Sequence, residues 1–402
     1  MKRELYTKLI ISAISLSLSL GIGEIVVRSY GHFDKDGNFF FKFKQLIPYN
    51  MPILTTQEKI NNYLSSPSSY IMYDSLLGWS PRPNSSSQNG LYHADSNGIR
   101  VIMPNIKYSK NPKDNTLRIA LFGDSYVHGD EVPYEHTWGF YLENSLKKTG
   151  INAEVINFGV GGHGTDQAFL RWKTLGKMFS PHIVILDFQP EMTKRNVNVV
   201  RPIYYPITNL IFSKPRFILE KNILKPINIP AIPPEELIDV MENIDSWDLA
   251  QYEYWLANYQ KTIWQKSKLI SLIVNEVPQI SKLYNISDDY YFSLNEEPAT
   301  ITRKITEEFK RDVETSGIKF YIVYLPLKEY FQDLFEGDEL PFNELLKEIE
   351  KIAYTIHPEH KLLIEAKQSK PEALFQGGHF SARANQIIAD VIAASIIQKK
   401  EE

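Results

Sequence analysis

Three short segments carry residues that could together perform nucleophilic chemistry. The first is Gly123-Asp124-Ser125, where Ser125 directly follows an apolar run and precedes a helical pattern. In open α/β sheets, ligands bind at the carboxyl ends of the strands, and a helix N-terminus favours developing negative charge. A serine in this position is suited to attack an acyl carbon. Taken alone, however, a Gly-Asp-Ser sequence is more often an ordinary turn or helix cap.

The other two segments supply what such a serine would need. Glycines cluster in Gly159-Val160-Gly161-Gly162, and their exposed backbone N–H groups could hold an oxyanion. His379 precedes the last helical pattern of the chain, where it could face Ser125 and act as its base. Each segment alone is weak evidence, since the loop could be a plain connection and a lone histidine is usually structural. Their order along the chain is much more specific.

The elements that must position these residues alternate between apolar runs and helical patterns. Such alternation predicts a parallel sheet covered by helices on both faces. The expected strands are 117–122, 153–158, 182–188 and 318–325, with a possible fifth at 362–365. The expected helices are 135–149, 165–178, 303–316, 340–356 and 381–398, the last with Ser381 as its N-cap.

We place the domain formed by these strands and helices at residues 116–396. One further segment precedes this domain and another is inserted in it. Residues 29–115 are rich in Pro, Ser and Asn and predict a linker with a small subdomain of turns and short strands. Residues 197–300 interrupt the alternation. They begin with a Pro-rich stretch and continue as a long helical region, roughly 234–285, which we interpret as an insertion near the active-site end of the sheet.

Residues 1–28 form the remaining segment, and they predict a membrane element. Lys2, Arg3 and Lys8 precede an uncharged run from Leu9 to Gly23. A span needs about 20 apolar residues, so the segment fits either a secretory signal or an uncleaved signal anchor. The weak small-residue pattern at Gly21-Ile22-Gly23 favours the anchor. The basic N-terminus places the body of the protein outside the cytoplasm, in the periplasm or at the cell surface. A buried helix of a cytosolic protein is the alternative.

Composition excludes several other classes of protein. The 402 residues contain no cysteine, which rules out disulfides, thiolate metal ligands and a cysteine nucleophile. The formal net charge is −4 and no basic block occurs, so nothing points to nucleic acid as a partner.

These motifs resemble those of the SGNH, or GDSL-type, hydrolase family, specifically its envelope-anchored group. Gly123 to Tyr126 resembles the block with the nucleophile, and Val155 to Gln167 resembles the block in which Gly162 would donate to the oxyanion hole. Gly378-His379-Phe380-Ser381 resembles the block with the catalytic histidine. The resemblance extends over nearly the whole chain. It implies a flavodoxin-like three-layer α/β/α sandwich and no cofactor or metal.

The sequence departs from the family pattern at two positions. Met192 stands where the family has an oxyanion asparagine, and the nearby Asn196 is the candidate to replace it. The family also has an aspartate two or three residues before its histidine, and here those residues are Gly377 and Gln376. A Ser125–His379 dyad is therefore expected, with the N–H groups of Ser125 and Gly162, and Asn196, as oxyanion donors.

Three further groups of residues have both a functional and a structural interpretation, and the structural one is favoured for each. His128 and His163, with Asp124, Asp130 and Asp166, could form a metal site but are more typical of hydrogen-bonding residues. Tyr252, Trp255, Tyr259 and Ile263 could be a glycan platform but fit a buried helical stripe better. Asp187, Glu191 and Glu131 could form a glycosidase pair, but are expected to be solvated or structural.

The sequence thus predicts a serine ester hydrolase, an acyl or acetyl esterase or an O-acyltransferase, acting on an envelope carbohydrate or lipid ester. The alternative is a weak or inactive scaffold that binds envelope glycan or assists polysaccharide modification.

Overall fold

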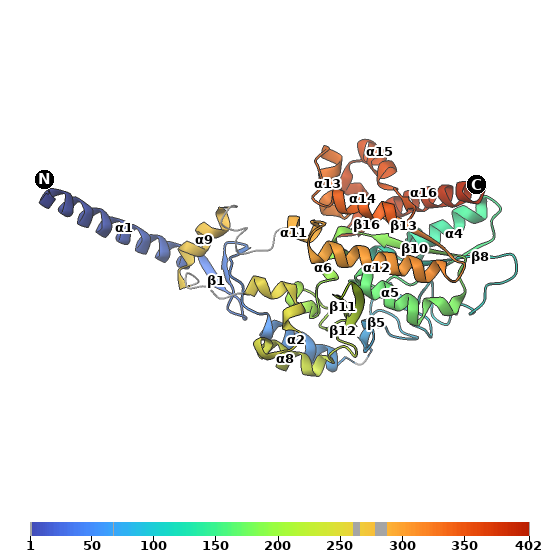
Figure 1. The fold of residues 1–402 in the computed structure, drawn as a ribbon, viewed down its shortest axis with the longest axis horizontal. Coiled ribbons are helices and arrows are strands. Elements are labelled where there is room, and N and C mark those ends of the chain that lie inside the picture. Colours follow the sequence, from blue (N-terminus) through green and yellow to red (C-terminus); the bar gives the residue numbers. More distant parts are fainter. Residues whose placement is uncertain (1, 67, 260–265, 278–287, 402) are drawn as a thin grey trace.

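The computed structural model describes residues 2–66, 68–259, 266–277 and 288–401. At its centre is a seven-stranded sheet in the order β14-β13-β10-β8-β9-β7-β6 (Figure 1). The strands, in that order, are Thr355–Ile356, Lys319–Tyr324, Ile183–Phe188, Leu117–Phe122, Ala153–Asn157, Arg100–Val101 and His93–Ala94. The first five strands pair in parallel, and β7 and β6 add antiparallel at the edge.

The parallel strands have a flavodoxin-like arrangement. Counted along the chain from β8, their order across the sheet is 2-1-3-4-5, so the direction of winding reverses between β8 and β10. Ligands bind outside the carboxyl ends of the strands at such a switch point. Ser125 follows β8 and therefore stands at this position. The predicted α/β/α sandwich with a parallel sheet is confirmed.

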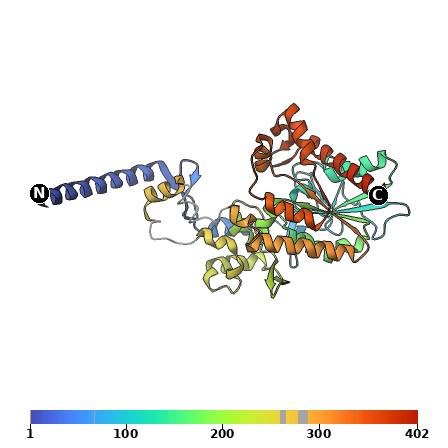
Figure 2. The ribbon, with the colours of Figure 1, turned by 45° about the horizontal axis from the view of Figure 1, so that its top comes forward.

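Helices cover both faces of the sheet because alternate strand residues point to opposite sides. In β8, Ala120 and Phe122 enter one core, while Ile119 and Leu121 enter the other. The first core is completed by α5 (Thr165–Thr174), α12 (Glu297–Glu314) and α14 (Asn343–Ile352), and the second by α4 (Trp138–Lys148), α15 (Glu359–Ser369) and α16 (Ala382–Glu401). Figure 2 shows α12 and α16 on opposite sides of the strands.

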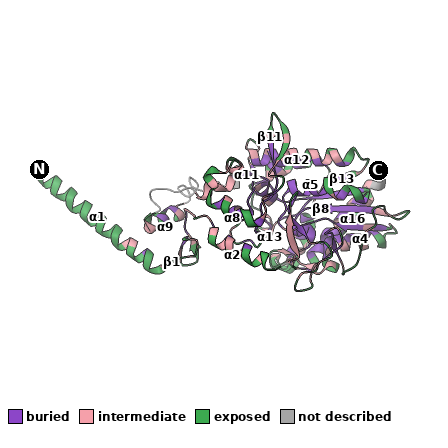
Figure 3. Cartoon of the chain, turned by 90° about the horizontal axis from the view of Figure 1, so that it is seen from below, coloured by how far each residue is buried: buried purple, intermediate pink, exposed green. Residues whose placement is uncertain are grey.

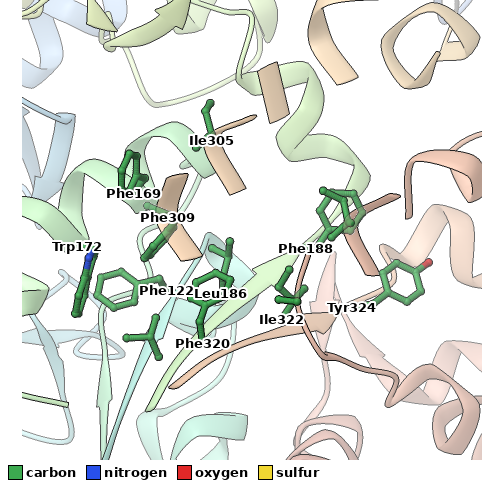
Figure 4. Close-up of a cluster of buried hydrophobic side chains, with 14 of the residues drawn as sticks. Phe122, Phe169, Trp172, Leu186, Phe188, Ile305, Phe309, Phe320, Ile322 and Tyr324 are labelled. Atoms are coloured by element: carbon green, nitrogen blue, oxygen red, sulfur yellow. The ribbon is translucent and has the colours of Figure 1, made fainter. Parts of the chain in front are cut away.

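The first core is built largely from aromatic rings (Figure 4). Phe309 of α12 lies with its ring centroid 5.7 Å from that of Phe122 and 5.4 Å from that of Phe169. Phe122 in turn stacks on Phe158 at 4.7 Å. These contacts fix α5 and α12 against the end of β8, where the Ser125 turn begins.

The N-terminal helix α1 (Lys2–Tyr30) projects away from the sheet, and its residues are mostly exposed (Figure 3). Within the described residues, its stretch Arg3–Tyr30 is the one helix long and apolar enough to cross a membrane, a property that a signal sequence shares. It contacts α9 (Lys268–Glu276), where Glu24 accepts hydrogen bonds from the amides of Lys268 and Leu269 at 2.9 and 2.8 Å.

Residues 31–115 contain short elements, two of which, β6 and β7, join the central sheet. The others are β1 (Gly31–Phe33), β2 (Phe39–Phe41), β3 (Lys44–Gln45), α2 (Ile53–Leu64), β4 (Ile71–Asp74) and β5 (Gly78–Pro81). The segment thus contains the short strands that the sequence indicates and also the helix α2, which was not expected, and part of it belongs to the main sheet.

Two predicted elements differ in the structure. Residues 362–365 lie within α15 rather than in a strand, and the fifth parallel strand is β14. The region 234–285 is not one long helix. It contains α8 (Pro234–Glu242), the short 3₁₀ helices η3 (Ile244–Ser246), η4 (Ala250–Tyr252) and η5 (Tyr254–Tyr259), and α9, after α7 (Arg201–Tyr204) and the hairpin β11 (Arg216–Glu220) to β12 (Ile223–Ile227).

The remaining short elements lie around the ends of the strands. They are α3 (Ser125–His128), η1 (Tyr134–His136), η2 (Gly176–Phe179), α6 (Pro190–Arg195), α11 (Asp288–Phe292), α13 (Lys328–Glu336), η7 (Pro371–Leu374), β15 (Phe375–Gln376) and β16 (His379–Phe380). Ser381 accepts a hydrogen bond from the amide of Ala384 at 3.4 Å, which fits the predicted N-cap of α16.

Removing the Phe309 ring tests the aromatic core. Phe309 is fully buried, so Phe309→Ala should lower the free energy of unfolding by about 3–5 kcal/mol through lost burial and the cavity left behind. Chemical denaturation would measure this, with the fully exposed Phe43→Ala as the matched control. Equal effects of the two substitutions would contradict this description of the core.

Candidate active site

The turn after β8 presents Ser125 at the start of α3. Gly123 permits this turn because a Cβ there would come within 1.9 Å of Asp187 Oδ1, closer than any side chain could be tolerated. Asp124 caps the helix, since its Oδ1 accepts a hydrogen bond from the Tyr126 amide at 2.8 Å. Ser125 retains 8% of its surface exposed. The turn therefore holds the serine at a helix N-terminus beside the switch point of the sheet.

The glycine loop after β9 lies against this turn. The amide of Val160 donates to the carbonyl of Gly123 at 3.1 Å, and a Cβ on Gly161 would lie 3.9 Å from Ser125 Cβ. Gly162 has a φ of +79°, which glycine adopts without strain. Within the described residues, no backbone acceptor pairs with the amides of Ser125, Gly161 or Gly162. These N–H groups are free to stabilise an oxyanion next to Ser125.

His379 comes to the same place from the far end of the chain. It lies on β16, in a hairpin with β15, and this hairpin packs against α3. The ring of His379 is 4.9 Å from that of Tyr126, centroid to centroid, and the Tyr126 hydroxyl donates to the Gly378 carbonyl at 2.7 Å. The residue that follows Ser125 therefore holds the segment that carries the histidine.

A carboxylate also lies beside His379, and it comes from Glu131. Its Oε2 is 3.3 Å from His379 Nδ1 and accepts hydrogen bonds from the amides of Gly378 at 2.9 Å and His379 at 3.1 Å. The contact with Nδ1 is at ion-pair distance without hydrogen-bond alignment. Glu131 thus brings a carboxylate to His379, although no acidic residue directly precedes the histidine in the sequence. Contrary to the sequence-based expectation, it faces the candidate site.

Sequence reasoning missed this role of Glu131 because the two residues are far apart in the chain. The one local signal is the pair of glycines before His379. A Cβ on Gly377 would lie 2.5 Å from both carboxylate oxygens of Glu131, so the glycine leaves room for that side chain. Glu131 itself has a φ of +69°, an uncommon backbone conformation for a residue with a side chain.

A second carboxylate, Asp130, closes the side of the site next to Gly161. Its Oδ1 is 2.5 Å from His128 Nδ1, and His128 Nε2 is 3.1 Å from the Tyr70 hydroxyl. Burial, followed by the charge of Arg100, lowers the pKa of His128, so this histidine is neutral near pH 7. Burial raises the pKa of Asp130, but its interactions with His128 and the charge of His379 outweigh that effect and lower it overall.

Beneath Ser125 lies a buried network of charges. Arg195 donates through Nη1 to Asp124 Oδ2 at 2.6 Å and to the carbonyl of His163 at 3.0 Å. Gln189 Nε2 lies 3.3 Å from both Asp124 Oδ1 and Asp187 Oδ2. Burial and the neighbouring charge of Asp124 raise the pKa of Asp187 well above its usual value. Asp187 is therefore buried rather than solvated.

Met192 and Asn196, the residues at and near the position of the family asparagine, make structural contacts in the interior. Met192 is fully buried in α6, with its sulfur 3.7 Å from the Thr165 hydroxyl. Asn196 ends that helix; its Nδ2 donates to Thr302 Oγ1 at 2.8 Å, and its Oδ1 accepts from the Asp166 amide at 3.2 Å. These bonds join α5, α6 and α12, so Asn196 has a structural role here and no hydrogen bond towards Ser125.

The other candidates have structural contacts. His163 is fully buried, and its Nε2 is 3.0 Å from the Trp79 carbonyl. Asp166 pairs with Lys214 in the interior. In the part of the chain that the structure describes, no three His, Cys, Asp or Glu side chains are grouped as metal ligands would be.

The predicted aromatic stripe and Glu191 are also accounted for by packing. Trp255 stacks on Tyr291 at 4.9 Å, Tyr259 donates to the Ile203 carbonyl at 2.7 Å, and Tyr252 lies on η4. Ile263 lies outside the described residues. Glu191 is partly buried, 3.6 Å from Lys194.

Comparison with known proteins gives likenesses among solved structures. No protein-family model matches the sequence, and no curated protein matches it. A lipolytic protein of the G-D-S-L family from Desulfitobacterium hafniense is similar over 69% of this chain and 98% of its own, with 11% identity and a TM-score of 0.35. An acetyl xylan esterase is similar over 70% and 100% (14% identity, TM-score 0.37), and a lipase/acylhydrolase from Enterococcus faecalis over 70% and 96% (13%, 0.37).

Replacing Glu131 tests whether its carboxylate supports His379. Glu131→Gln keeps the size of the side chain but removes its charge, so we expect Ser125 to react with a fluorophosphonate on the order of 10²–10⁴-fold more slowly. Labelling rates would be followed by mass spectrometry, with the exposed Glu135→Gln as the control. An unchanged rate would exclude this role, and Asp130→Asn would then test the second carboxylate.

The raised pKa of Asp187 makes a prediction about stability. The folded protein holds this proton to higher pH than the unfolded chain, whose aspartate pKa is about 3.9. The contribution of Asp187 to the free energy of unfolding is therefore present below the unfolded pKa and is lost as the pH rises through the folded pKa. The side chain of Asp187→Asn cannot ionise, so the variant does not lose this stability as the pH rises. The free energy of unfolding of the variant minus that of the natural protein should therefore increase from about pH 4 to about pH 8. Denaturation at both pH values, with exposed Asp245→Asn as control, would measure it; a constant difference would mean that folded Asp187 is ionised.

Proposed function

We propose that this protein is a serine ester hydrolase in which Ser125 is the nucleophile and His379 the base. The observation that carries the proposal is the convergence of three segments: Ser125 at a helix N-terminus, free loop amides beside it, and the His379 hairpin packed on the same helix. Nucleophile, base and oxyanion donors are the three components that acyl transfer requires.

The reaction would proceed in two halves. His379 takes the proton of Ser125 as the hydroxyl oxygen attacks the ester carbonyl, and the N–H groups of Ser125 and Gly162 stabilise the oxyanion. The protonated His379 then gives its proton to the departing alcohol, which leaves an acyl-serine. Water, activated by His379, completes hydrolysis; a sugar hydroxyl in its place would complete transfer of the acyl group. Glu131 would orient the imidazole and stabilise its charged form.

A groove next to the site, lined by polar and aromatic side chains, supports a carbohydrate ester as the substrate. This cavity of about 630 Å³ is lined by side chains such as Asn62, Ser69 and Asn89 together with Tyr70 and Tyr92. Tyr92 accepts a hydrogen bond from the Glu131 amide at 2.9 Å, and Tyr70 contacts His128, so the groove shares a wall with the site. Amides, hydroxyls and aromatic rings suit sugar hydroxyls and sugar faces. An acetylated envelope glycan is the substrate that this lining supports best.

The position of the enzyme would follow from α1. This helix is long, apolar and exposed, which suits a signal anchor that holds the body outside the cytoplasm. The helix projects from the folded part of the chain, so an anchor would leave the groove open to a substrate in the periplasm or at the cell surface.

One observation favours a second function. The buried Met192 occupies the place of an oxyanion donor, and losing one such donor typically slows catalysis by about 10²–10³-fold. With that loss, the chain would bind envelope glycan or assist its modification without turnover.

A serine-reactive probe separates the two functions without knowledge of the substrate. We expect the full chain, purified in detergent, to be labelled by a fluorophosphonate at Ser125, and His379→Ala to react at least about 10³-fold more slowly because the base is gone. Ser125→Ala should abolish the adduct, while the exposed Ser316→Ala should not change it. A folded protein that is not labelled would favour the binding function.

A further inference from the structure

Arg201 is a buried cation that makes no ion pair at contact distance with any carboxylate of the described residues. It begins α7 and is 7% exposed, with its guanidinium 4.7 Å from the centroid of the Tyr204 ring and 5.6 Å from that of Tyr205. Its Nε and Nη1 are buried and have no hydrogen-bond partner. Among the described residues, no carboxylate forms an ion pair with it, although most other buried arginines nearby are paired or hydrogen-bonded.

Such an arrangement is unfavourable and needs an explanation. Removing a guanidinium from water destabilises the folded protein unless an opposite charge and hydrogen bonds compensate for the lost hydration. Contact with two aromatic rings compensates for only part of this loss. A bound anion is one explanation of a buried polar group that has no hydrogen-bond partner in the folded protein.

The exposed part of Arg201 lies beside the glycine loop of the candidate active site. A Cβ on Gly162 would lie 3.7 Å from Arg201 Nη2, the one terminal nitrogen that is not fully buried. Gly162 is the residue whose amide would hold the oxyanion, and its neighbour Gly161 lies against Ser125. A group bound to Nη2 would therefore lie at the mouth of the glycine loop, next to a substrate ester.

The charges around Arg201 leave it without an ion-pair partner in direct contact. Arg195 is neutralised by Asp124, and the raised pKa of Asp187 favours its uncharged form. Burial and then the charge of Arg195 lower the pKa of Arg201 to about 9, while the charge of Glu191 acts in the opposite direction, so the guanidinium is charged at neutral pH. Among the described residues, Glu191 makes no ion pair with Arg201 and instead lies 3.6 Å from Lys194.

We infer that Arg201 binds a negatively charged oxygen group, a carboxylate or a phosphate, carried by the substrate close to its ester. The inference rests on the proposed function and narrows its substrates from esters in general to esters that carry a negative charge. In an acidic glycan the group would be the carboxylate of a uronic acid; in a lipid or a phosphorylated polymer it would be a phosphate. Arginine suits both, because its charge is delocalised and its N–H donors are fixed in a plane.

Calorimetric titration of the full-length Ser125→Ala protein tests the inference without turnover. The anionic probes are trigalacturonate and glycerol 3-phosphate, and their neutral counterparts are galactotriose and glycerol. We expect at least one anionic probe to bind more tightly than its counterpart, and the probe that binds identifies the source of the charge. Adding Arg201→Met should weaken that binding by on the order of 10- to 100-fold, because one charge-assisted hydrogen bond is lost.

Thermal unfolding distinguishes this role from a structural one. Arg201→Met removes an unpaired buried charge but keeps a long side chain against Tyr204, so the Tm should stay the same or rise. The exposed Arg311→Met makes the same change of charge on α12 and should alter neither property. A fall in Tm larger than that of Arg311→Met, equal binding of anionic and neutral probes, or undiminished binding by Arg201→Met would overturn the inference.

Failure of the inference can be told apart from failure of the proposed function. Labelling of Ser125 in the natural protein together with no anion binding would leave a hydrolase whose substrate is neutral. Anion binding without labelling would retain the Arg201 subsite in a protein that does not turn over.

Discussion

The ion pair between Asp124 and Arg195 is the interaction on which the geometry of the site depends. Asp124 is fully buried directly before Ser125, so its charge must be compensated for the turn after β8 to form. Arg195 does this from the end of α6 and also donates to the carbonyl of His163 beyond the glycine loop. One guanidinium therefore ties together the nucleophile turn, the glycine loop and the segment after β10.

Contacts from residues near Ser125 also position His379. Glu131 follows α3 by three residues and binds two backbone amides of the hairpin that carries His379, while the Tyr126 hydroxyl binds the carbonyl of Gly378. Both contacts start from residues close to Ser125. Ser125 and His379, 254 positions apart in the sequence by their numbering, are thus joined through one short stretch of chain.

The sequence predicts four of the five parallel strands, and the loops that carry Ser125, Gly162 and His379, because these depend on local patterns. The run Leu117–Phe122 is apolar apart from Arg118, as expected of a strand buried on both faces. Residues 362–365 mislead because the buried Leu362 and Ala366 form one side of a helix, and a run of three apolar residues cannot distinguish a helix from a strand.

The contacts of Glu131, Asn196 and Arg201 could not be predicted, since each depends on how distant segments meet. Glu131 reaches the His379 hairpin, Asn196 reaches Thr302, and Arg201 reaches the glycine loop. No spacing in the sequence records such contacts. A single sequence shows which residues could act, whereas the fold shows which of them come together.

The position of Glu131 has a consequence for how chains of this kind are recognised. A search pattern that demands an acidic residue two or three positions before the histidine would pass over this sequence, because Gln376 and Gly377 stand there. Yet a carboxylate reaches the same side of the imidazole from another part of the chain. When a catalytic group and its partner are encoded in separate segments, either can change by mutation without disturbing the local motif of the other. A search by motif spacing then finds only some of the sequences that can form the same arrangement of side chains.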